Sequence, residues 1–249
     1  MEQSDFIKRI RDLSERCGRK GCITNTCFLT PAECYELEKL HLPADEVTVH
    51  LSGGTEGCER QAAFFLPYYI EESAFDAGEF IKAVRIRSYF GEPGHRDYLG
   101  AILALGIERD RIGDILICGD TAYVFCLASV LPVLLSELDK VGRCGVKTAE
   151  IPLTDVPLPE KKVKKLSFTV KSLRLDAVTG DMFGVSRTTA AEAIRLGLIT
   201  LNYSVCEKTD TAVCEGDVIS FRGKGKGKVS AVGGKSKKDR LFIEAEIYI

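Results

Sequence analysis

Residues 174–228 read RLDAVTGDMFGVSRTTAAEAIRLGLITLNYSVCEKTDTAVCEGDVISFRGKGKGK, and this stretch decides the fold of the last third of the chain. Apolar residues recur at helical spacing in two short segments, one after Arg174 and one after Ser186, which can cap the second helix. Strand-like segments follow at 198–205 and 218–222, and 241–249 alternates as a final strand. The order predicts two short helices packed on a small twisted sheet.

The arginines of this stretch favour RNA binding. Arg174 precedes the first helix and Arg187 stands beside Ser186 at the start of the second. Guanidinium groups make forked bonds to phosphate, and helix N-termini add amide donors, so these residues can line one phosphate track. Asp176 is expected to be a helix cap or a partner that holds Arg187, because carboxylates repel phosphate.

A basic glycine-rich loop is predicted after Phe221, where lysine and glycine alternate from 224 to 228. Glycine lets the backbone approach RNA closely while the ammonium groups neutralise phosphates. The alternative is a mobile, solvated loop. The predicted RNA-binding residues are Arg174, Asp176, Ser186, Arg187, Asn202, Lys208, Arg222, Lys224, Lys226 and Lys228.

Charge is divided unevenly along the chain. Residues 1–160 hold 17 Lys/Arg and 26 Asp/Glu, a net charge of −9, whereas residues 161–249 hold 17 and 10, a net charge of +7. Such asymmetry is typical of a nucleic-acid-binding module attached to an acidic body. A lysine-rich solvated face is the simpler alternative, and it accounts less well for lysines interleaved with glycine.

Length and composition exclude several classes of protein. With 249 residues and 45% hydrophobic residues, the chain can form two or three domains with cores of their own. It has no run of eighteen apolar residues and its polar, acidic start lacks the pattern of a secretory signal, so we expect a cytoplasmic protein without a membrane partner.

The ten cysteines do not form a metal-binding pattern. There is no Cys-x-x-Cys pair, and the closest group, Cys17, Cys22, Cys27 and Cys34, has spacings of five, five and seven. The three histidines stand apart from them. We therefore predict free thiols, no metal site and no cofactor.

The first two thirds of the chain are predicted to form two domains of mixed helix and strand. In residues 1–75, a helix at 4–16, a capping box from Thr30 to Glu33 and a β-hairpin spanning 47–66 make a small α+β unit. In residues 76–158 the predicted elements are strand 81–89, helix 95–105, strand 112–118, strand 123–127, helix 132–138 and strand 142–153.

The order β-α-β-β-α-β in residues 76–158 is the ferredoxin-like arrangement shared with RNA-recognition domains. Such domains stack bases on aromatic side chains of their central strands, so Tyr123 and Phe125 either stack RNA bases or belong to the core. Strand 81–89 has one basic face, with Arg85 and Arg87. Prolines 152, 157 and 159 and the charged residues 160–165 predict a stiff linker into a third domain, residues 164–249.

Two family resemblances follow from these residues. The Arg-Leu-Asp, Ser-Arg, Gly-Leu-Ile-Thr-Leu-Asn and Glu-Gly-Asp-Val-Ile elements resemble the S4-type RNA-binding domain (αL motif) over residues 166–232. Residues 94–115 resemble the bacterial YlmH family, which shares the three-part layout with the RNA-binding domain last. The chain departs from the S4 pattern at Asn202-Tyr203, where Asn-Gly is usual, so we expect a hairpin turn that is wider or of another type. Gly180 inside the first helix is a second departure, disfavoured by about 1 kcal/mol against alanine.

The YlmH resemblance implies an α+β protein that binds ribosomal RNA and peptidyl-tRNA on the large ribosomal subunit. It implies a role in bacterial ribosome-associated quality control, where related proteins assist the non-templated extension of stalled chains. A link of the family to cell division is then an indirect effect of defective translation. No small-molecule substrate is expected.

An RNA-modifying enzyme, such as a pseudouridine synthase or its targeting subunit, is the alternative. The chain's Arg-Leu-Asp lies inside the RNA-binding segment, and fewer than 75 residues follow it, which is too few for a catalytic domain. His95, Arg96 and Asp97 suggest acid-base chemistry, but adjacent helical residues point apart, and first-turn capping explains them more simply. We therefore predict a non-catalytic protein with no catalytic residues.

Overall fold

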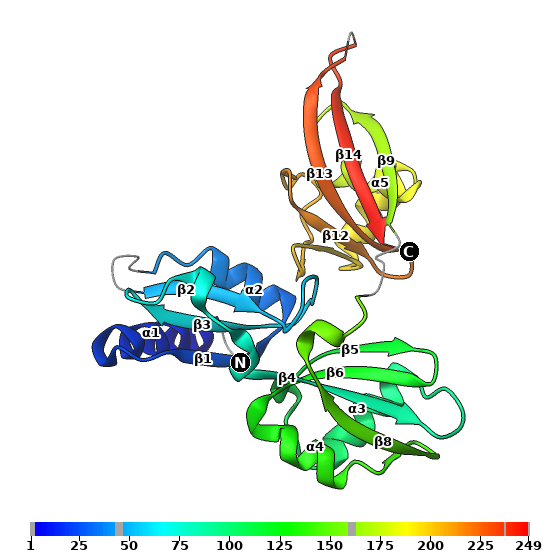
Figure 1. The fold of residues 1–249 in the computed structure, drawn as a ribbon. Helices are drawn as coiled ribbons and strands as arrows, with labels where there is room; N and C mark the ends of the chain where they lie inside the picture. Colours follow the sequence, from blue (N-terminus) through cyan, green and yellow to red (C-terminus); the bar gives the residue numbers. More distant parts are fainter. Residues whose placement is uncertain (1–2, 43–46, 159–162, 237, 249) are drawn as a thin grey trace. The chain divides into compact units, whose positions relative to one another are not determined.

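The computed structural model describes residues 3–42, 47–158, 163–236 and 238–248 of an α+β protein. The chain folds into two compact units, Met1–Pro159 and Glu160–Ile249 (Figure 1). Pro159 and residues 160–162 of the expected linker lie outside the described residues. None of the described helices is both long and apolar enough to cross a membrane.

The first part of unit 1 is a three-stranded antiparallel sheet in the order β1-β3-β2. Its elements are α1 Gln3–Lys20, β1 Thr24–Leu29, α2 Pro31–Glu38, β2 Val47–Ser52 and β3 Gln61–Pro67. The predicted capping box at the start of α2 is confirmed, because Thr30 N–H donates to Glu33 Oε2 at 2.7 Å and Glu33 N–H donates to Thr30 Oγ1 at 3.3 Å. Phe6, Ile10 and Cys17 attach α1 to this sheet through one buried cluster.

The second part of unit 1 has the strand order β5-β6-β4-β8-β7, with antiparallel pairs. Its elements are β4 Ile81–Ser88, α3 His95–Ala104, β5 Ile112–Cys118, β6 Thr121–Leu127, α4 Leu131–Glu137, β7 Lys140–Val141 and β8 Cys144–Ile151, with short 3-10 turns at Glu72–Ala74, Ala77–Glu79, Arg109–Arg111, Ala128–Val130 and Leu153–Asp155. The order of the predicted elements is confirmed, with β7 added before β8. Tyr98 and Ile102 of α3 and Leu134 of α4 pack on one face of this sheet.

The opposite face of the second sheet is partly covered by the first sheet. Phe125 is fully buried in a cluster that also contains Phe28 and Phe64, so the suggestion that it stacks RNA bases is wrong. Tyr123 is partly buried against the same cluster. The physical reason is the apolar surface of β1 and β3, which can leave water only by packing on β4 and β6.

Unit 2 is a six-stranded sheet in the order β11-β10-β12-β13-β14-β9, with α5 against one face (Figure 1). Its elements are β9 Val163–Val170, α5 Leu175–Phe183, α6 Arg187–Arg195, β10 Ile199–Leu201, β11 Ser204–Val205, β12 Val218–Phe221, β13 Gly225–Lys235 and β14 Leu241–Tyr248. One buried cluster joins Leu175, Val178 and Met182 of α5 and Ile194 of α6 to the strands.

The glycine-rich segment expected to be a loop is a turn only at residues 222–224, and from Gly225 onward it is a strand. β13 pairs with β12 on one side and β14 on the other, with Lys228 opposite both Val218 and Glu246. Glycine is needed here because a Cβ at position 227 would lie 2.8 Å from Met182 Sδ and 3.1 Å from Glu246 O. Gly227 therefore allows α5 to approach the sheet, which the sequence pattern did not reveal.

The expectation that the turn at Asn202-Tyr203 is wider or of another type is also wrong. Leu201 pairs with Ser204, and both intervening residues have positive φ, 48° and 68°, which makes a two-residue turn of the I′ kind. The Asn202 side chain supports it, because its Nδ2 donates to Asp217 Oδ1 at 2.7 Å and its Oδ1 accepts from Val218 N–H at 2.9 Å. These bonds offset the unfavourable backbone conformation of Tyr203.

Gly180 has a packing role in the helix pair α5–α6. A Cβ there would lie 3.2 Å from the carbonyl oxygen of Val185 and 3.6 Å from the backbone of Arg187. Gly180 O also accepts the N–H of Val185 at 2.9 Å at the end of α5. Gly184, with φ 64°, ends the helix and turns the chain toward α6. The glycine thus lets the start of α6 lie directly against α5.

We expect Gly180→Ala to lower the free energy of unfolding by roughly 1–3 kcal/mol, because the added methyl group meets backbone atoms that cannot move freely. Gly100→Ala in α3 is the matched control, since nothing lies within 4 Å of its Cβ position. Alanine there should raise stability by about 0.5–1 kcal/mol through helix propensity. Urea unfolding of the full chain measures both, and two stabilising substitutions would contradict the packing role of Gly180.

Candidate nucleic-acid interface

A buried carboxylate holds two arginines at the start of α5 and α6. Asp176 accepts from Arg174 Nε at 3.3 Å and Nη2 at 3.2 Å, and from Arg187 Nη2 at 3.1 Å. The exposed fraction of the side chain is 7% for Asp176 but 38% for Arg174 and 56% for Arg187. We call these three residues the arginine cluster. It fixes two cations whose remaining N–H donors are available at the surface.

Charge is retained on the buried member of the arginine cluster. Burial by itself raises the pKa of the Asp176 carboxyl, but hydrogen bonds from Arg174 and Arg187 outweigh it and leave the pKa below its ordinary value. The carboxylate therefore stays ionised and orients both guanidinium groups. Of the two roles considered for Asp176, a partner for Arg187 agrees with this geometry.

Backbone contacts fix the surroundings of the arginine cluster. Ser186 caps α6, since its Oγ accepts from Thr189 N–H at 3.0 Å. At α5, the Asp176 N–H donates to Thr209 O at 3.1 Å. That bond occupies an amide that was expected to face phosphate, but it also brings the neighbouring residue, exposed Lys208, to the start of α5.

A small cavity adjoins the arginine cluster and was missed by sequence reasoning. It has a volume of about 220 Å³ and is lined by Lys171, Asp181, Arg187 and Arg240 among others. Arg240 donates from Nε to Thr169 Oγ1 at 3.0 Å and from Nη2 to the carbonyl oxygen of the same residue. Only the pairing of β9 with β14 brings these cations together, so local spacing could not reveal them.

Two of the predicted residues lie at the far end of α6. Arg222 and Lys224 belong to the β12–β13 turn, where the Arg222 N–H donates to Leu198 O at 2.9 Å. Leu198 follows the C-terminal end of α6, and the helix rises by about 12 Å from Arg187 to Arg195. These cations extend the basic surface but are not part of the arginine cluster.

Lys226 and Lys228 project from the sheet face opposite the helices, because the alternate residues Gly227 and Val229 face α5 and the core. The Lys226 ammonium lies 5.5 Å from the ring centre of Tyr248. The Lys228 position pairs with Glu246, so this face carries both signs of charge. The structure therefore does not bring all predicted cations onto one surface.

A second basic surface lies on the uncovered half of the second sheet of unit 1. Arg85 and Arg87 of β4 are exposed, and Arg87 pairs with exposed Lys147 of β8 while binding Asp120 at 3.2 Å. Tyr89 is 69% exposed at the end of the same strand. Cations beside a free aromatic ring are typical of surfaces that bind single-stranded RNA. The basic face of β4 was predicted, but Lys147 and Tyr89 were not.

Residues considered for catalysis and metal binding have structural surroundings. Asp97 Oδ2 accepts from Gly94 N–H at 2.8 Å, so its carboxylate caps α3, as first-turn capping predicted. In the parts of the chain that the structure describes, no three His, Cys, Asp or Glu side chains lie close enough together to hold a metal ion. The expectation of a metal-free protein stays a prediction.

Comparisons with known proteins agree with an RNA-binding surface. Residues 78–155 match a family model described as "Putative RNA-binding domain in YlmH". The chain is 35% identical over 223 residues to "Ribosome-associated protein quality control protein P2" of Bacillus subtilis (strain 168), which covers 89% of this chain and 86% of that protein. The solved structure "Cell division protein ylmH from Streptococcus pneumoniae" is similar in fold, with a TM-score of 0.54 and 22% identity over 62% of this chain and 94% of that chain.

We expect Asp176→Asn to lower the free energy of unfolding at pH 7 by roughly 1–2 kcal/mol, since it removes ionic hydrogen bonds that solvent partly screens. The folded pKa is below the unfolded value near 3.9, so this stabilisation is present above about pH 4 and is lost as the pH falls through the folded pKa. The difference between wild type and variant should therefore shrink in acid.

Denaturant unfolding at pH 7 and near pH 3 measures that difference. Asp181→Asn, which changes an exposed carboxylate on the same helix, is the control and should shift stability by less than about 0.5 kcal/mol. A loss for Asp176→Asn that is equal at both pH values would contradict the ionic role of Asp176.

Proposed function

This chain belongs to the YlmH family, and on that premise we propose that it is a non-catalytic RNA-binding factor of ribosome-associated quality control. An RNA-binding, ribosome-associated role follows from the relative's name and the family model. The finer proposal is that the chain binds ribosomal RNA and peptidyl-tRNA on the large ribosomal subunit, in the cytoplasm. There it would assist the non-templated extension of stalled chains.

The arginine cluster is the observation that carries this proposal. Two guanidinium groups, held by one buried carboxylate at 3.1–3.3 Å, present fixed donors at neighbouring helix starts. Arginine in such a pre-organised position binds phosphate oxygens with little further loss of side-chain entropy. The net charge of +7 in residues 161–249 attracts a polyanion to the same unit.

We propose further that residues 164–249 form an S4-type domain. The helix pair α5–α6, the following short hairpin β10–β11 and strand β12 occur in the order that the S4 resemblance implies. The RNA backbone would then run along the starts of α5 and α6, past Lys208, Lys171 and Arg240. The division of residues 1–158 into domains 1–75 and 76–158 is part of the same proposal.

A binding role accounts for the site better than catalysis does. The only carboxylate in the arginine cluster is ionised and engaged by two guanidinium groups, so it is a poor proton acceptor. Positively charged groups that contact phosphates position RNA and raise affinity without reacting with it. The experiments below also test the alternative, that the chain modifies RNA.

We expect Arg174→Gln/Asp176→Asn/Arg187→Gln to lose at least about 100-fold in affinity for large ribosomal subunits, because two charge-assisted contacts to phosphate disappear. Replacing all three residues avoids an unpaired buried carboxylate. Sedimentation with purified subunits at low salt measures the loss. Lys164→Gln, which also lowers the charge by one on an exposed part of unit 2, is the control and should bind nearly as wild type.

Normal sedimentation of the folded triple variant would show that the arginine cluster is not the anchor. The catalytic alternative is tested by mapping modified nucleotides in the ribosomal RNA of cells that produce the wild-type chain or a variant. A modification that requires this chain, and that is lost in an Asp97→Ala variant which still binds subunits, would contradict a non-catalytic role.

A further inference from the structure

The exposed face of α1 concentrates positive charge within an acidic unit. The helix holds six of the 17 Lys/Arg of residues 1–160 and only three of the 26 Asp/Glu. The rest of that stretch is therefore strongly acidic. More than a third of the cations of this acidic unit therefore share one helix, and their position calls for a physical explanation.

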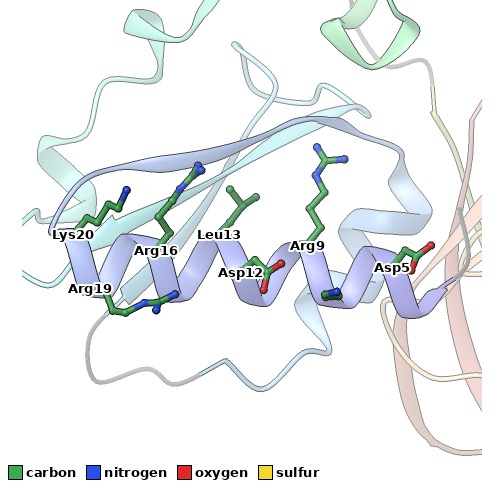
Figure 2. Close-up of a pocket in the computed structure, with 8 residues that line it drawn as sticks. Asp5, Arg9, Asp12, Leu13, Arg16, Arg19 and Lys20 are labelled. Carbon is green, nitrogen blue, oxygen red and sulfur yellow. The ribbon is translucent and has the colours of Figure 1, made fainter.

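Five of these six cations, all but Arg11, line the side of α1 that the fold leaves open. Phe6, Ile10 and Cys17 attach the helix to the sheet and are buried. The exposed side forms a groove of about 640 Å³, lined by Asp5, Lys8, Arg9, Asp12, Leu13, Arg16, Arg19 and Lys20. Figure 2 shows Arg9, Arg16 and Lys20 extending from one side of the helix together with Leu13, while Asp12 and Arg19 come from the other.

The length and composition of the groove indicate its ligand. From Lys8 to Lys20 the helix rises by about 18 Å, so the cations span several phosphates of one nucleic-acid strand. Among the described residues that line the groove none is aromatic, so the groove itself offers no ring on which a base could stack. Backbone phosphate, rather than base edges, is the chemistry that a row of guanidinium and ammonium groups recognises.

We propose that the basic face of α1 is a second RNA-binding surface, which holds the sugar-phosphate backbone of RNA independently of the arginine cluster. It adds a contact in unit 1 to the one proposed for unit 2. Two weak electrostatic contacts on one chain raise the overall affinity by effective concentration, without any sequence being read. RNA is favoured over an acidic protein because the chain's other basic surfaces also fit phosphates.

Asp12 gives the proposal an internal test. It lines the same groove as Arg9 and Arg16, where its carboxylate repels phosphate and lowers the local positive charge. Removing this charge should strengthen RNA binding, whereas removing cations should weaken it. A surface with no RNA-binding role would respond to neither change.

The experiment uses the full chain with its arginine cluster intact. Arg9→Gln/Arg16→Gln/Lys20→Gln and Asp12→Asn are compared with two controls of equal charge change, Arg96→Gln/Lys140→Gln/Arg143→Gln and Glu137→Gln. All four control residues are exposed and belong to unit 1. Binding to purified large ribosomal subunits and to RNA extracted from them is measured across a range of salt concentrations, after circular dichroism has verified folding.

We expect the α1 triple variant to bind the extracted RNA on the order of 10-fold more weakly at low salt, with the slope of log affinity against log salt reduced by about 2–3. Asp12→Asn should bind more tightly, and both controls should change little. If the α1 variant and its control lost affinity equally, net charge alone would explain the loss and the proposal would be overturned.

Two further outcomes separate this proposal from others. If the α1 variant no longer binds intact subunits but binds extracted RNA as tightly as wild type, the groove binds a ribosomal protein and the proposal is wrong. If the arginine-cluster variant binds normally while the α1 variant does not, the anchor proposed for unit 2 fails and this one stands. Unchanged binding of the folded α1 variant in both assays overturns it.

Discussion

The contact between Asp176 and its two arginines is the interaction on which the proposed function depends. One buried carboxylate joins the starts of α5 and α6 and fixes the side chains that face outward. Both guanidinium groups favour its ionised state, whereas burial by itself raises the pKa of the carboxyl. The close approach of the helices at Gly180 brings α6 near enough for Arg187 to reach the carboxylate. Packing and electrostatics are therefore parts of one arrangement.

The cations of the chain form several surfaces on an otherwise acidic protein. Unit 2 presents the arginine cluster with Lys208 and the cavity beside it, and unit 1 presents the open half of its second sheet and the face of α1. Each suits phosphate, and the sheet surface adds an exposed aromatic ring, that of Tyr89. Several contacts of modest strength suit a factor that must bind a large RNA assembly and leave it again.

The sequence predicted most of the elements and part of the site. Apolar periodicity and the capping box at Thr30 located the helices and strands, because these signals are local. Tertiary contacts decided the rest. Gly227 makes room for Met182 in a strand that reads like a loop, and Phe125 is covered by a sheet from the preceding part of the chain. Arg174 and Arg187 were found, whereas Lys171 and Arg240 meet only through strand pairing.

A cryo-electron microscopy structure of the full chain bound to the large ribosomal subunit tests the central claim most directly. We predict that the guanidinium groups of Arg174 and Arg187 lie within hydrogen-bonding distance of RNA phosphate oxygens, at about 2.7–2.9 Å, while Asp176 still holds both. A complex in which the arginine cluster faces solvent or a ribosomal protein, with RNA bound elsewhere on unit 2, would contradict it.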